Sequence, residues 1–418
     1  MPYVTMTTDT VLFALWSVLI ALRPWLPGSL YTRLDSAYQL LLTLTTALIL
    51  IRHWQRARNS LRGDPLLGLL LSALVLGLWA ATRTHSVPAA LWILHLILQA
   101  CLIYAVARSC GDKLQKLVMA GTAWSSLGVS LLVLWQVCFG YTAAFEVALR
   151  LGIQDPGVLR FLGAHRAFGP FVSPNLAAGF LLLGCGVCFA HFRHWSARGL
   201  PLLALLLTQS LGAWLCLGTA FLVLYRHQKM TSSRNLYRWA LFLGTFSVLF
   251  LFLLRHGSWS DFAGAEHSFQ GRIAVWGICL QMILSQPWTG WGLGNLGAAY
   301  SLFYQPNALP SSLAHSWPLQ WGVEMGMGGL FLGTSILGMI FWRTRNLWKE
   351  PELKWLALGI WACSLHFLGD VGAAFPELWL PYWAIVGCAV PAPPAFGAVS
   401  PVQSHGTRKQ HFGSQGTE

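Results

Sequence analysis

Long apolar runs separated by short polar stretches make up most of the chain. A helix needs ~20 mostly apolar residues to cross a bilayer, whereas a transmembrane barrel would show alternating segments of ~10 residues. The continuous runs therefore predict an all-α fold, a polytopic transmembrane helical bundle. The runs lie near residues 5–22, 37–51, 65–82, 88–107, 116–138, 176–192, 239–254, 317–342, 354–371 and 377–392.

The stretch 199–225 is long enough for one helix or for a tight pair of helices. Arg198 precedes it and Arg226 follows it. If both basic flanks lie on the inner side, the chain crosses an even number of times between them. We therefore predict two short helices that turn near Gln209–Gly212, which gives about twelve spans in all.

Composition and charge agree with this class. Only 10% of the residues are charged and 55% are hydrophobic, whereas a soluble protein carries about 25% charged residues. A soluble multidomain enzyme and a disordered chain are therefore excluded. The net charge of +13 is typical of nucleic-acid binding, but here topology explains it, so no nucleic acid is expected as a partner.

The positive-inside rule orients the chain with its N-terminus inside. The inner loops then hold every Lys and most of the Arg residues. The basic residues that remain on the outer side are all arginines, namely Arg23, Arg33, Arg83, Arg150, Arg160, Arg166, Arg255 and Arg272.

Two outer segments, 139–175 and 255–316, are long enough to build a site. The first ends in a turn rich in Gly and Pro that carries Arg166 at the membrane surface. Asn175 follows it and is well placed to cap the helix that starts at Leu176. A simpler interpretation of Arg166 is an anchor to lipid headgroups.

The second outer segment begins with a predicted helix from Gly271 to Gln286, which Pro287 ends. Its apolar positions follow one helix face, so we expect it to lie on the outer membrane surface. Arg272 would then occupy the first turn, where a cation is unfavourable for the helix dipole, which hints at another purpose. The Gly-rich turn 290–295 is predicted to be flexible and does not fit a nucleotide-binding loop.

His315 closes this segment at the mouth of the span 317–342. A lone His at a membrane interface is more often structural than catalytic. Glu324 lies one to two turns below the mouth, and Asp370 lies near the outer end of its own span. Acids within a membrane are functional candidates, and both could equally pair with outer arginines.

The residue types on the outer side indicate one kind of chemistry. The outer loops contain no pair of carboxylates and no His/Cys cluster with metal-ligand spacing, so we predict neither a metal nor a cofactor. They offer Arg, which recognises phosphate through paired hydrogen bonds, and His, which suits general-base catalysis near neutral pH. Together these predict a substrate with a phosphate leaving group and a hydroxyl nucleophile.

An ordered set of motifs follows the same segments. It consists of Arg166, Gly169 and Pro174-Asn175; Gly271-Arg272, Trp276, Pro287, Gly290, Gly292 and Gly294-Asn295; and Ala314-His315-Ser316, Leu319-Gln320, Glu324, Gly326 and Gly328-Gly329-Leu330. The set resembles the superfamily of bacterial O-antigen ligases and O-antigen polymerases, best over residues 160–340. The chain departs from the family at Ser173, where Asn is usual, and at Leu211, where Arg is frequent.

The resemblance implies an inverting, metal-independent membrane glycosyltransferase of the GT-C type. Such an enzyme takes a glycan from an undecaprenyl diphosphate carrier and passes it to a lipid or glycan acceptor. His315 would match the catalytic histidine, and Arg166 and Arg272 would match the diphosphate-binding arginines. The supporting residues would be Asn175, Glu324 and Asp370.

The resemblance also implies a bacterial inner-membrane protein with cytoplasmic termini, a periplasmic active site and membrane lipids as partners. We divide the chain into an N-terminal five-span bundle, 1–138, and an O-antigen ligase-like domain, 139–392. That domain carries the periplasmic helical loop 255–316 between spans 9 and 10. We expect residues 393–418 to form a disordered cytoplasmic tail, since they are rich in Pro, Gly, Ser and Gln.

Three hypotheses about function remain open at this point. The first is a glycan ligase or polymerase, whose acceptor is lipid A core, another repeat unit or a protein. The second is a transporter of bicarbonate or another small anion, since some members of the superfamily carry that label. A transporter would need charge along its path and helices broken at mid-membrane, whereas the ionisable residues here crowd the outer mouth. The third is a structural protein that is anchored to lipid headgroups.

Overall fold

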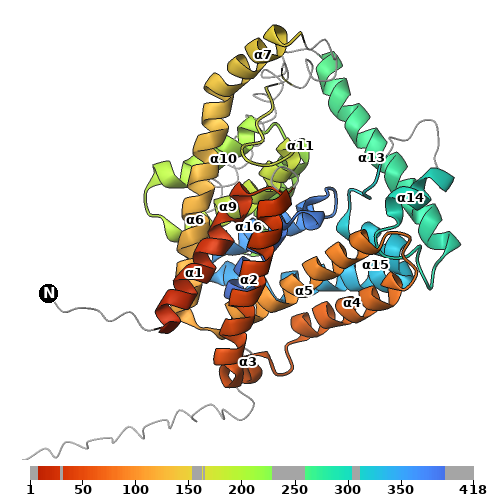
Figure 1. The fold of residues 1–418 in the computed structure, drawn as a ribbon. Coiled ribbons are helices and arrows are strands. Elements are labelled where there is room, and N and C mark those ends of the chain that lie inside the picture. Colours follow the sequence, from red (N-terminus) through yellow and green to blue (C-terminus); the bar gives the residue numbers. More distant parts are fainter. Residues whose placement is uncertain are drawn as a thin grey trace, which may run out of the picture.

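The computed structural model of the chain describes residues 8–28, 32–152, 162, 165–227, 259–303 and 311–390. Within these ranges all regular secondary structure is helical, which confirms the predicted all-α class (Figure 1). The predicted span 239–254 and the predicted tail 393–418 lie outside the described residues.

The main helices follow the apolar runs of the sequence. The first part of the chain forms α1 (Thr8–Leu22), α2 (Thr32–Arg52), α3 (Trp54–Leu61), α4 (Pro65–Ala81), α5 (Val87–Ser109) and α6 (Asp112–Trp135). The second part forms α7 (Tyr141–Arg150), α9 (Pro174–His191), α10 (Trp195–Leu207), α11 (Leu211–His227), α13 (Trp259–Ser285), α14 (Leu296–Tyr300), α15 (Trp317–Thr344), α16 (Lys354–His366) and α17 (Pro376–Ala389).

Five of the described helices are long and apolar enough to cross a membrane, and the pair α3 and α4, bent by 99°, makes a sixth if it counts as one span. Helices α1, α10, α11, α16 and α17 have only 13 to 17 residues, which is shorter than the ~20 that a full crossing needs. The chain is a multi-pass helical membrane protein, and the count of twelve spans stays a prediction.

The stretch 199–225 forms two helices, as predicted. α10 ends at Leu207 and α11 begins at Leu211. Between them, Gln209 adopts a left-handed backbone conformation with φ 53°, which interrupts the helical backbone.

The helix that contains the predicted span 116–138 continues beyond residue 138. A π-helical segment, Gln136–Gly140, joins α6 to α7, and together they run for 39 residues from Asp112 to Arg150. Gly140 does not end the helix, since it keeps helical dihedral angles with φ −67° and ψ −39°. In Figure 1 the combined helix is a rod that projects from the bundle.

α13 begins at Trp259, well before the predicted start at Gly271, and ends at Ser285 just before Pro287. Its first half is polar, so the apolar pattern on which the prediction rested begins only later along the helix. Arg272 therefore lies in the middle of α13 rather than in its first turn. The argument from the helix dipole at this position is wrong.

α15 is not the straight span that the sequence predicts. Gly326 breaks it with φ 71° and ψ −164°, which leaves two arms, 317–325 and 327–344. A Cβ atom placed on Gly329 would lie 2.2 Å from the carbonyl oxygen of Trp321. In a continuous helix these two residues would be separated by ~12 Å, so the two arms fold back on each other as a helical hairpin.

Glycines line the contact between the two arms. A Cβ atom on Gly333 would lie 3.1 Å from the Cα of Pro318, and one on Gly322 would lie 3.2 Å from the Cβ of Leu330. Such close approach of two helices requires residues without large side chains. Trp317, where the short arm begins, is therefore level with the middle of the long arm rather than with its end.

α16 is also shorter than predicted. It ends at His366, so Asp370 lies in the turn that follows the helix and not inside a span of residues 354–371. The backbone N–H of Trp317 donates to the carbonyl oxygen of Phe367 at 2.9 Å. This hydrogen bond ties the start of the hairpin to the turn that carries Asp370.

One hydrophobic core extends from Phe13 on α1 to Val390 after α17. Within it α5 packs against α17, and α4 packs against α15. The core thus joins the two predicted domains, and the boundary at residue 138 stays a prediction.

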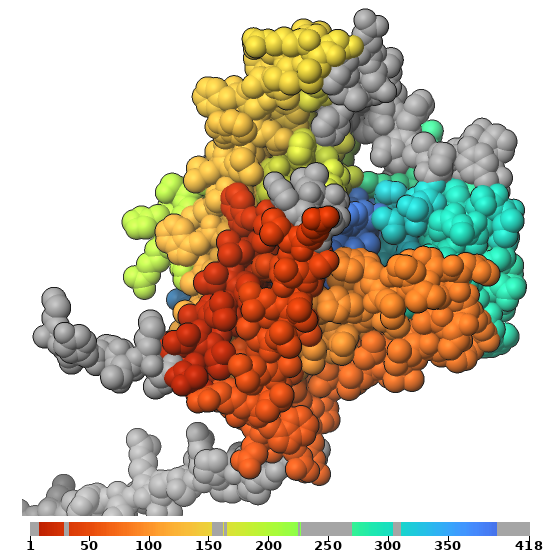
Figure 2. Space-filling model, in the orientation of Figure 1, coloured from red at the N-terminus to blue at the C-terminus, as the bar shows by residue number. Residues whose placement is uncertain are grey.

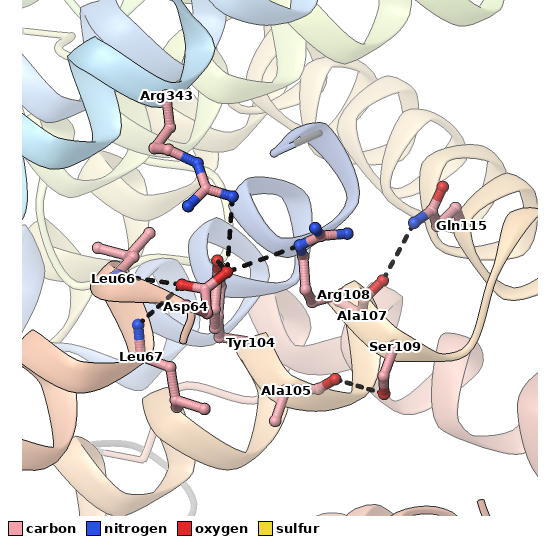
Figure 3. Close-up of polar contacts among 10 residues, drawn as sticks. All are labelled: Asp64, Leu66, Leu67, Tyr104, Ala105, Ala107, Arg108, Ser109, Gln115 and Arg343. Carbon is pink, nitrogen blue, oxygen red and sulfur yellow. Dashed lines mark hydrogen bonds and ion pairs between the residues drawn. The ribbon is translucent and has the colours of Figure 1, made fainter. Parts of the chain in front are cut away.

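Three polar side chains converge on Asp64 at one end of α4 and α5 (Figure 3). Its Oδ1 atom accepts from the first backbone N–H groups of α4 at 3.0 and 3.1 Å, which caps that helix. Its Oδ2 atom accepts from the Tyr104 hydroxyl at 3.0 Å and lies 3.8 Å from Arg108 Nε and 3.6 Å from Arg343 Nη2. The charge pattern assigns Arg108 and Arg343 to the inner side, and both lie next to the same oxygen of Asp64.

Candidate functional site

A cleft of about 350 Å³ lies beside the hairpin. Its walls come from α5, the Gly-rich turn, the loop before α15, the short arm, the turn after α16, and α17. Figure 2 shows blue residues of the C-terminal part in a recess between the orange N-terminal helices and the cyan residues near α15. The ionisable residues of the lining are His315, Glu324 and Asp370.

His315 stands directly before the short arm of the hairpin. Its backbone is left-handed, with φ 50°, a conformation that costs about 1–2 kcal/mol for a residue with a side chain. The neighbours hold this conformation, since Ala314 N–H donates to Gln320 Oε1 at 2.8 Å. Within the described ranges the buried Nδ1 atom of His315 has no hydrogen-bond partner. A strained, incompletely bonded residue of this kind is typical of a functional site.

The surroundings lower the pKa of the His315 imidazole from its ordinary value of 6.5. Burial is the main cause, because it removes water from the charged form. The Asp370 carboxylate opposes this shift, and the Arg272 guanidinium adds to it. The ring is therefore neutral at pH 7, which is the form that accepts a proton.

Arg272 and Asp370 form an ion pair next to His315. Arg272 Nη2 donates to Asp370 Oδ2 at 3.1 Å, and Nη1 donates to the Gly369 carbonyl at 2.8 Å. The Asp370 side chain is 2% exposed and the Arg272 side chain 20%. One of the two interpretations of Asp370 from the sequence was an ion pair with an outer Arg, and its pair with Arg272 agrees with that interpretation.

Glu324 is buried on the short arm, with 1% of its surface exposed. Its Oε1 atom accepts from Gln320 Nε2 at 2.6 Å, and Gln320 Oε1 in turn holds the backbone of Ala314. Glu324 thus connects through one amide to the residue before His315. The predictions gave Gln320 no role, although its spacing from Glu324 is that of one helical turn.

Arg166 is held by a separate group of residues. Its Nε atom donates to the Thr208 carbonyl and its Nη2 atom to Asn175 Oδ1, both at 3.3 Å. The prediction that Asn175 caps the following helix is wrong, because α9 begins at Pro174 and Ser173 Oγ accepts from Leu176 N–H at 3.2 Å. Asn175 contacts the arginine instead.

The π-helical segment holds the turn that carries Arg166. Gln136 Oε1 accepts from the backbone N–H groups of Phe168 at 3.0 Å and Gly169 at 2.9 Å. The Tyr141 hydroxyl donates to the carbonyl of Arg166. The irregular turn of the long helix thus positions a candidate binding residue, a frequent use of π segments.

The Gly-rich turn is tightly packed, so the prediction that it is flexible is wrong. Gly290, Gly292 and Gly294 have φ values of 62°, 93° and 78°. A Cβ atom on Gly290 would lie 2.5 Å from the backbone of Glu324, and one on Gly292 would lie 2.5 Å from the Arg83 carbonyl oxygen. Glycine is needed at these positions because the backbone has positive φ and because neighbouring backbone atoms approach closely.

Asn295 fastens this turn to the loop between α4 and α5. Its Nδ2 atom donates to the carbonyls of Arg83 at 3.0 Å and Trp291 at 2.7 Å. Its Oδ1 atom accepts from the backbone N–H of His85 at 2.9 Å. With 2% of its surface exposed, Asn295 is a structural residue next to Gly294 of the cleft lining.

Aromatic side chains of the cleft were also missed by the sequence analysis. Trp92, Trp317, Trp321, Phe375 and Trp379 come from three separate parts of the chain and meet in its lining. The only available signal was the high Trp content, 22 residues. Because Trp also marks membrane interfaces, that signal alone did not indicate a site.

Multiple apolar helices define a multi-pass helical membrane protein, and a cleft lined by aromatic and ionisable side chains lies next to its helical hairpin. Residues 198–334 match the family model described as O-antigen ligase. This part contains Arg272, His315 and Glu324, whereas Arg166 and Asp370 lie outside it.

The chain is also similar to a general O-oligosaccharyltransferase of Acinetobacter baylyi. The two are 24% identical over an alignment of 288 residues, which covers 63% of this chain and 45% of that protein. The chain thus matches less than half the length of this relative. Both comparisons confirm the resemblance to the O-antigen ligase superfamily that the motifs indicated.

Proposed function

We propose that the protein transfers a glycan from an undecaprenyl diphosphate carrier to an acceptor hydroxyl on the periplasmic face of the inner membrane. The observation that carries the proposal is the position of His315 in the lining of the cleft, together with Asp370 and its ion-pair partner Arg272. The O-antigen ligase match and the oligosaccharyltransferase relative support the same class of reaction.

His315 acts as the general base of this reaction. The acceptor hydroxyl gives its proton to the imidazole while its oxygen attacks the anomeric carbon of the donor glycan. The bond from that carbon to the diphosphate oxygen breaks, and the lipid diphosphate leaves. A single displacement inverts the anomeric configuration. Asp370 stabilises the imidazolium that forms, because a nearby carboxylate favours the charged ring.

Arg166 and Arg272 bind the diphosphate and neutralise the charge that develops on it. The contacts of Arg272 with Gly369 and Asp370 orient its guanidinium and leave its remaining N–H groups to a ligand. Thr208 and Asn175 orient Arg166 through neutral oxygens. Fixed cations supply the stabilisation that a metal ion provides in other transferases, so the proposed mechanism is metal-independent.

The break in α15 does not favour the alternative of anion transport. A transporter uses the free backbone groups of a broken helix to coordinate its substrate. Here Met327 N–H donates to the Pro287 carbonyl at 2.7 Å, and the Val323 carbonyl accepts from Trp291 N–H at 2.8 Å. These backbone groups at the break are thus already hydrogen-bonded to Pro287 and to the Gly-rich turn.

Purified protein in lipid nanodiscs tests the proposal. With a lipid-diphosphate glycan and a panel of lipid, glycan and peptide acceptors, we expect a product of inverted linkage and release of the lipid diphosphate. Absence of product with every acceptor, together with anion uptake into vesicles, would contradict the proposal in favour of transport.

Chelation tests the metal-independent mechanism separately. We expect the rate of transfer to be unchanged in excess EDTA. A loss of activity that Mg²⁺ or Mn²⁺ restores would refute this part of the mechanism and leave the reaction class intact.

A further inference from the structure

We propose that another cleft, on the predicted inner side of the membrane, binds the head group of phosphatidylethanolamine through its anionic phosphate and its cationic ammonium group. The cleft has a volume of about 440 Å³, within the range of ~300–1,000 Å³ that is typical of ligand sites. The first turns of α1 and α6, the start of α3 and the turns before α3 and α6 line it. It shares no lining residue with the cleft that contains His315, so the inference goes beyond the proposed function.

Helix α3 lies along the membrane surface beside this cleft. It carries Arg56 and Arg58 within eight residues, so it is too polar for the hydrocarbon core, and it is bent by 99° from the apolar helix α4. Trp54 at its start is 62% exposed, and Trp favours the head-group region. Figure 1 shows α3 at the end of the bundle opposite α7. The cleft therefore lies at the depth of lipid head groups.

The lining carries charges of both signs. Its basic and acidic side chains, besides a histidine, are Arg56, Lys113, Asp9 and Asp112. Asp9 already pairs with Arg52. Among the residues that the structure describes, neither Arg56 nor Asp112 forms a salt bridge, although both line the same cleft. A cation and an acid that share a cleft without pairing suit a ligand that itself carries both charges.

The two basic side chains are placed to bind the phosphate. A Cβ atom on Gly111 would collide with Arg56 Nη2, so the guanidinium lies against the turn between α5 and α6. Gly111 has φ 80°, which glycine adopts readily. Lys113 Nζ donates to Thr10 Oγ1 at 2.7 Å, and an ammonium group has three donors, so others remain for a ligand. Guanidinium and ammonium groups both form charge-assisted hydrogen bonds with phosphate.

The two acids select the rest of the head group. Asp9 and Asp112 repel a free phosphate or the purely anionic head group of phosphatidylglycerol. A primary ammonium group donates hydrogen bonds to carboxylates, whereas the choline of phosphatidylcholine has the same charge and no N–H to donate. The position at the membrane surface favours the lipid over soluble phosphoethanolamine, because the bilayer supplies the lipid at high local concentration.

Native mass spectrometry of the purified full chain in detergent tests this site. The probes are phosphatidylethanolamine, phosphatidylglycerol and phosphatidylcholine with identical acyl chains, and soluble glycerophosphoethanolamine is the competitor. For the first bound lipid we expect a Kd about tenfold lower for phosphatidylethanolamine than for the other two, as one additional charge-assisted contact provides. The soluble competitor should displace it only at a much higher concentration.

Two substitutions separate the two halves of the head group. Arg56→Gln removes a phosphate contact, and Asp112→Asn removes an ammonium contact. Each should raise the Kd for phosphatidylethanolamine about tenfold, and Asp112→Asn should not weaken the binding of phosphatidylglycerol, so the preference disappears. Arg58→Gln and Glu352→Gln, the matched controls, remove exposed charges outside the cleft and should bind all three lipids as the wild type does.

Thermal unfolding in detergent is a second measurement. A ligand that binds only the folded protein raises its unfolding midpoint. Phosphatidylethanolamine should therefore raise the midpoint of the wild type and of Arg58→Gln more than that of Arg56→Gln. An equal rise in all three proteins would contradict the proposed site.

Four results of the lipid titration would overturn the inference. They are equal affinity of the wild type for phosphatidylglycerol, equal affinity for phosphatidylcholine, equal binding by cleft variants and controls, and equally strong competition by glycerophosphoethanolamine. The last result would assign the cleft to a soluble phosphoester. Neither measurement requires glycan transfer, so failure of this inference leaves the proposed function intact, and failure of the transfer assay leaves the lipid site intact.

Discussion

Two buried aspartates, Asp64 and Asp370, occupy contrasting surroundings. Both pair with arginine, and their residues are 4% and 2% exposed. Each oxygen of Asp64 has partners, since one caps α4 and the other meets Tyr104, Arg108 and Arg343 (Figure 3). Asp370 uses one oxygen for Arg272 and, within the described ranges, leaves the other without a hydrogen bond.

The difference separates a carboxylate with a purely structural role from one that could still bind a ligand. A carboxylate whose oxygens are all bonded fixes the elements around it and has no capacity for a ligand. Asp370, with Glu324 and His315 beside it, keeps buried hydrogen-bonding capacity unused at the wall of a cleft. Substitutions at the two places should therefore affect different properties, stability at Asp64 and catalysis at the cleft.

The largest effect is expected at His315. His315→Ala removes the general base, and we expect glycan transfer to fall about 10²–10⁴-fold, with thermal stability in detergent unchanged. His194→Ala, which removes an exposed histidine at the start of α10, is the matched control. Transfer at the wild-type rate in the His315 variant would show that the base lies elsewhere.

At Asp64 the expected effect is on stability. Asp64→Ala leaves Arg108 and Arg343 buried beside an apolar methyl group, and breaking a buried pair in this way costs about 3–5 kcal/mol. The measurement is the unfolding midpoint in detergent. Asp9→Ala, which breaks the half-exposed pair with Arg52, should lower that midpoint far less. Similar midpoints for the two variants would contradict the structural role of Asp64.

The hairpin provides a test of intermediate size. Gly326→Ala adds a Cβ atom to a residue with positive φ and places that atom 2.5 Å from the Pro287 carbonyl oxygen. The substitution should lower the free energy of unfolding by at least about 1–2 kcal/mol. It should also reduce transfer, because the short arm carries Glu324 and holds the His315 loop. Gly338 lies in the long arm, and a Cβ atom there would have open space around it. Gly338→Ala should therefore leave both the unfolding midpoint and the rate of transfer near the wild-type values. A folded, fully active Gly326 variant would refute the importance of the break.

The smallest effect is a shift in pH dependence. Because the pKa of His315 lies below 6.5, kcat/KM should fall on the acid side of that value, where the ring gains a proton. Asp370 raises this pKa, so Asp370→Asn should move the acid-side inflection to lower pH while the maximal rate also falls. A shift to higher pH would mean that the titrating group is not His315.

The sequence predicted the elements that depend on local pattern. The all-α class, the pair of helices around Gln209, and the end of α13 before Pro287 followed from apolar runs and turn residues. The hairpin did not, because an apolar stretch of 28 residues has the same pattern whether it is straight or folded at Gly326. Only the glycines at 322, 326, 329 and 333 carried a signal, and small residues are common in membrane helices for other reasons.

The candidate site was predicted in its chemistry but not in its assembly. Arg272, Asp370 and His315 were chosen separately by residue type and side, and the structure brings them together. Gln320 was part of the motif set but was given no role. The aromatic lining was missed, because it depends on contacts between segments far apart in the chain. Asn175 was assigned to a helix cap that Ser173 provides, since both types serve equally well as caps.

The short arm of the hairpin also has a consequence for biogenesis. Residues 317–325 are too few to enter the bilayer as an independent crossing. Their position depends on the Gly-rich turn and on the loop between α4 and α5, both of which are synthesised earlier. We therefore expect the long helices to insert first and the short arm to dock afterwards onto a partly assembled bundle.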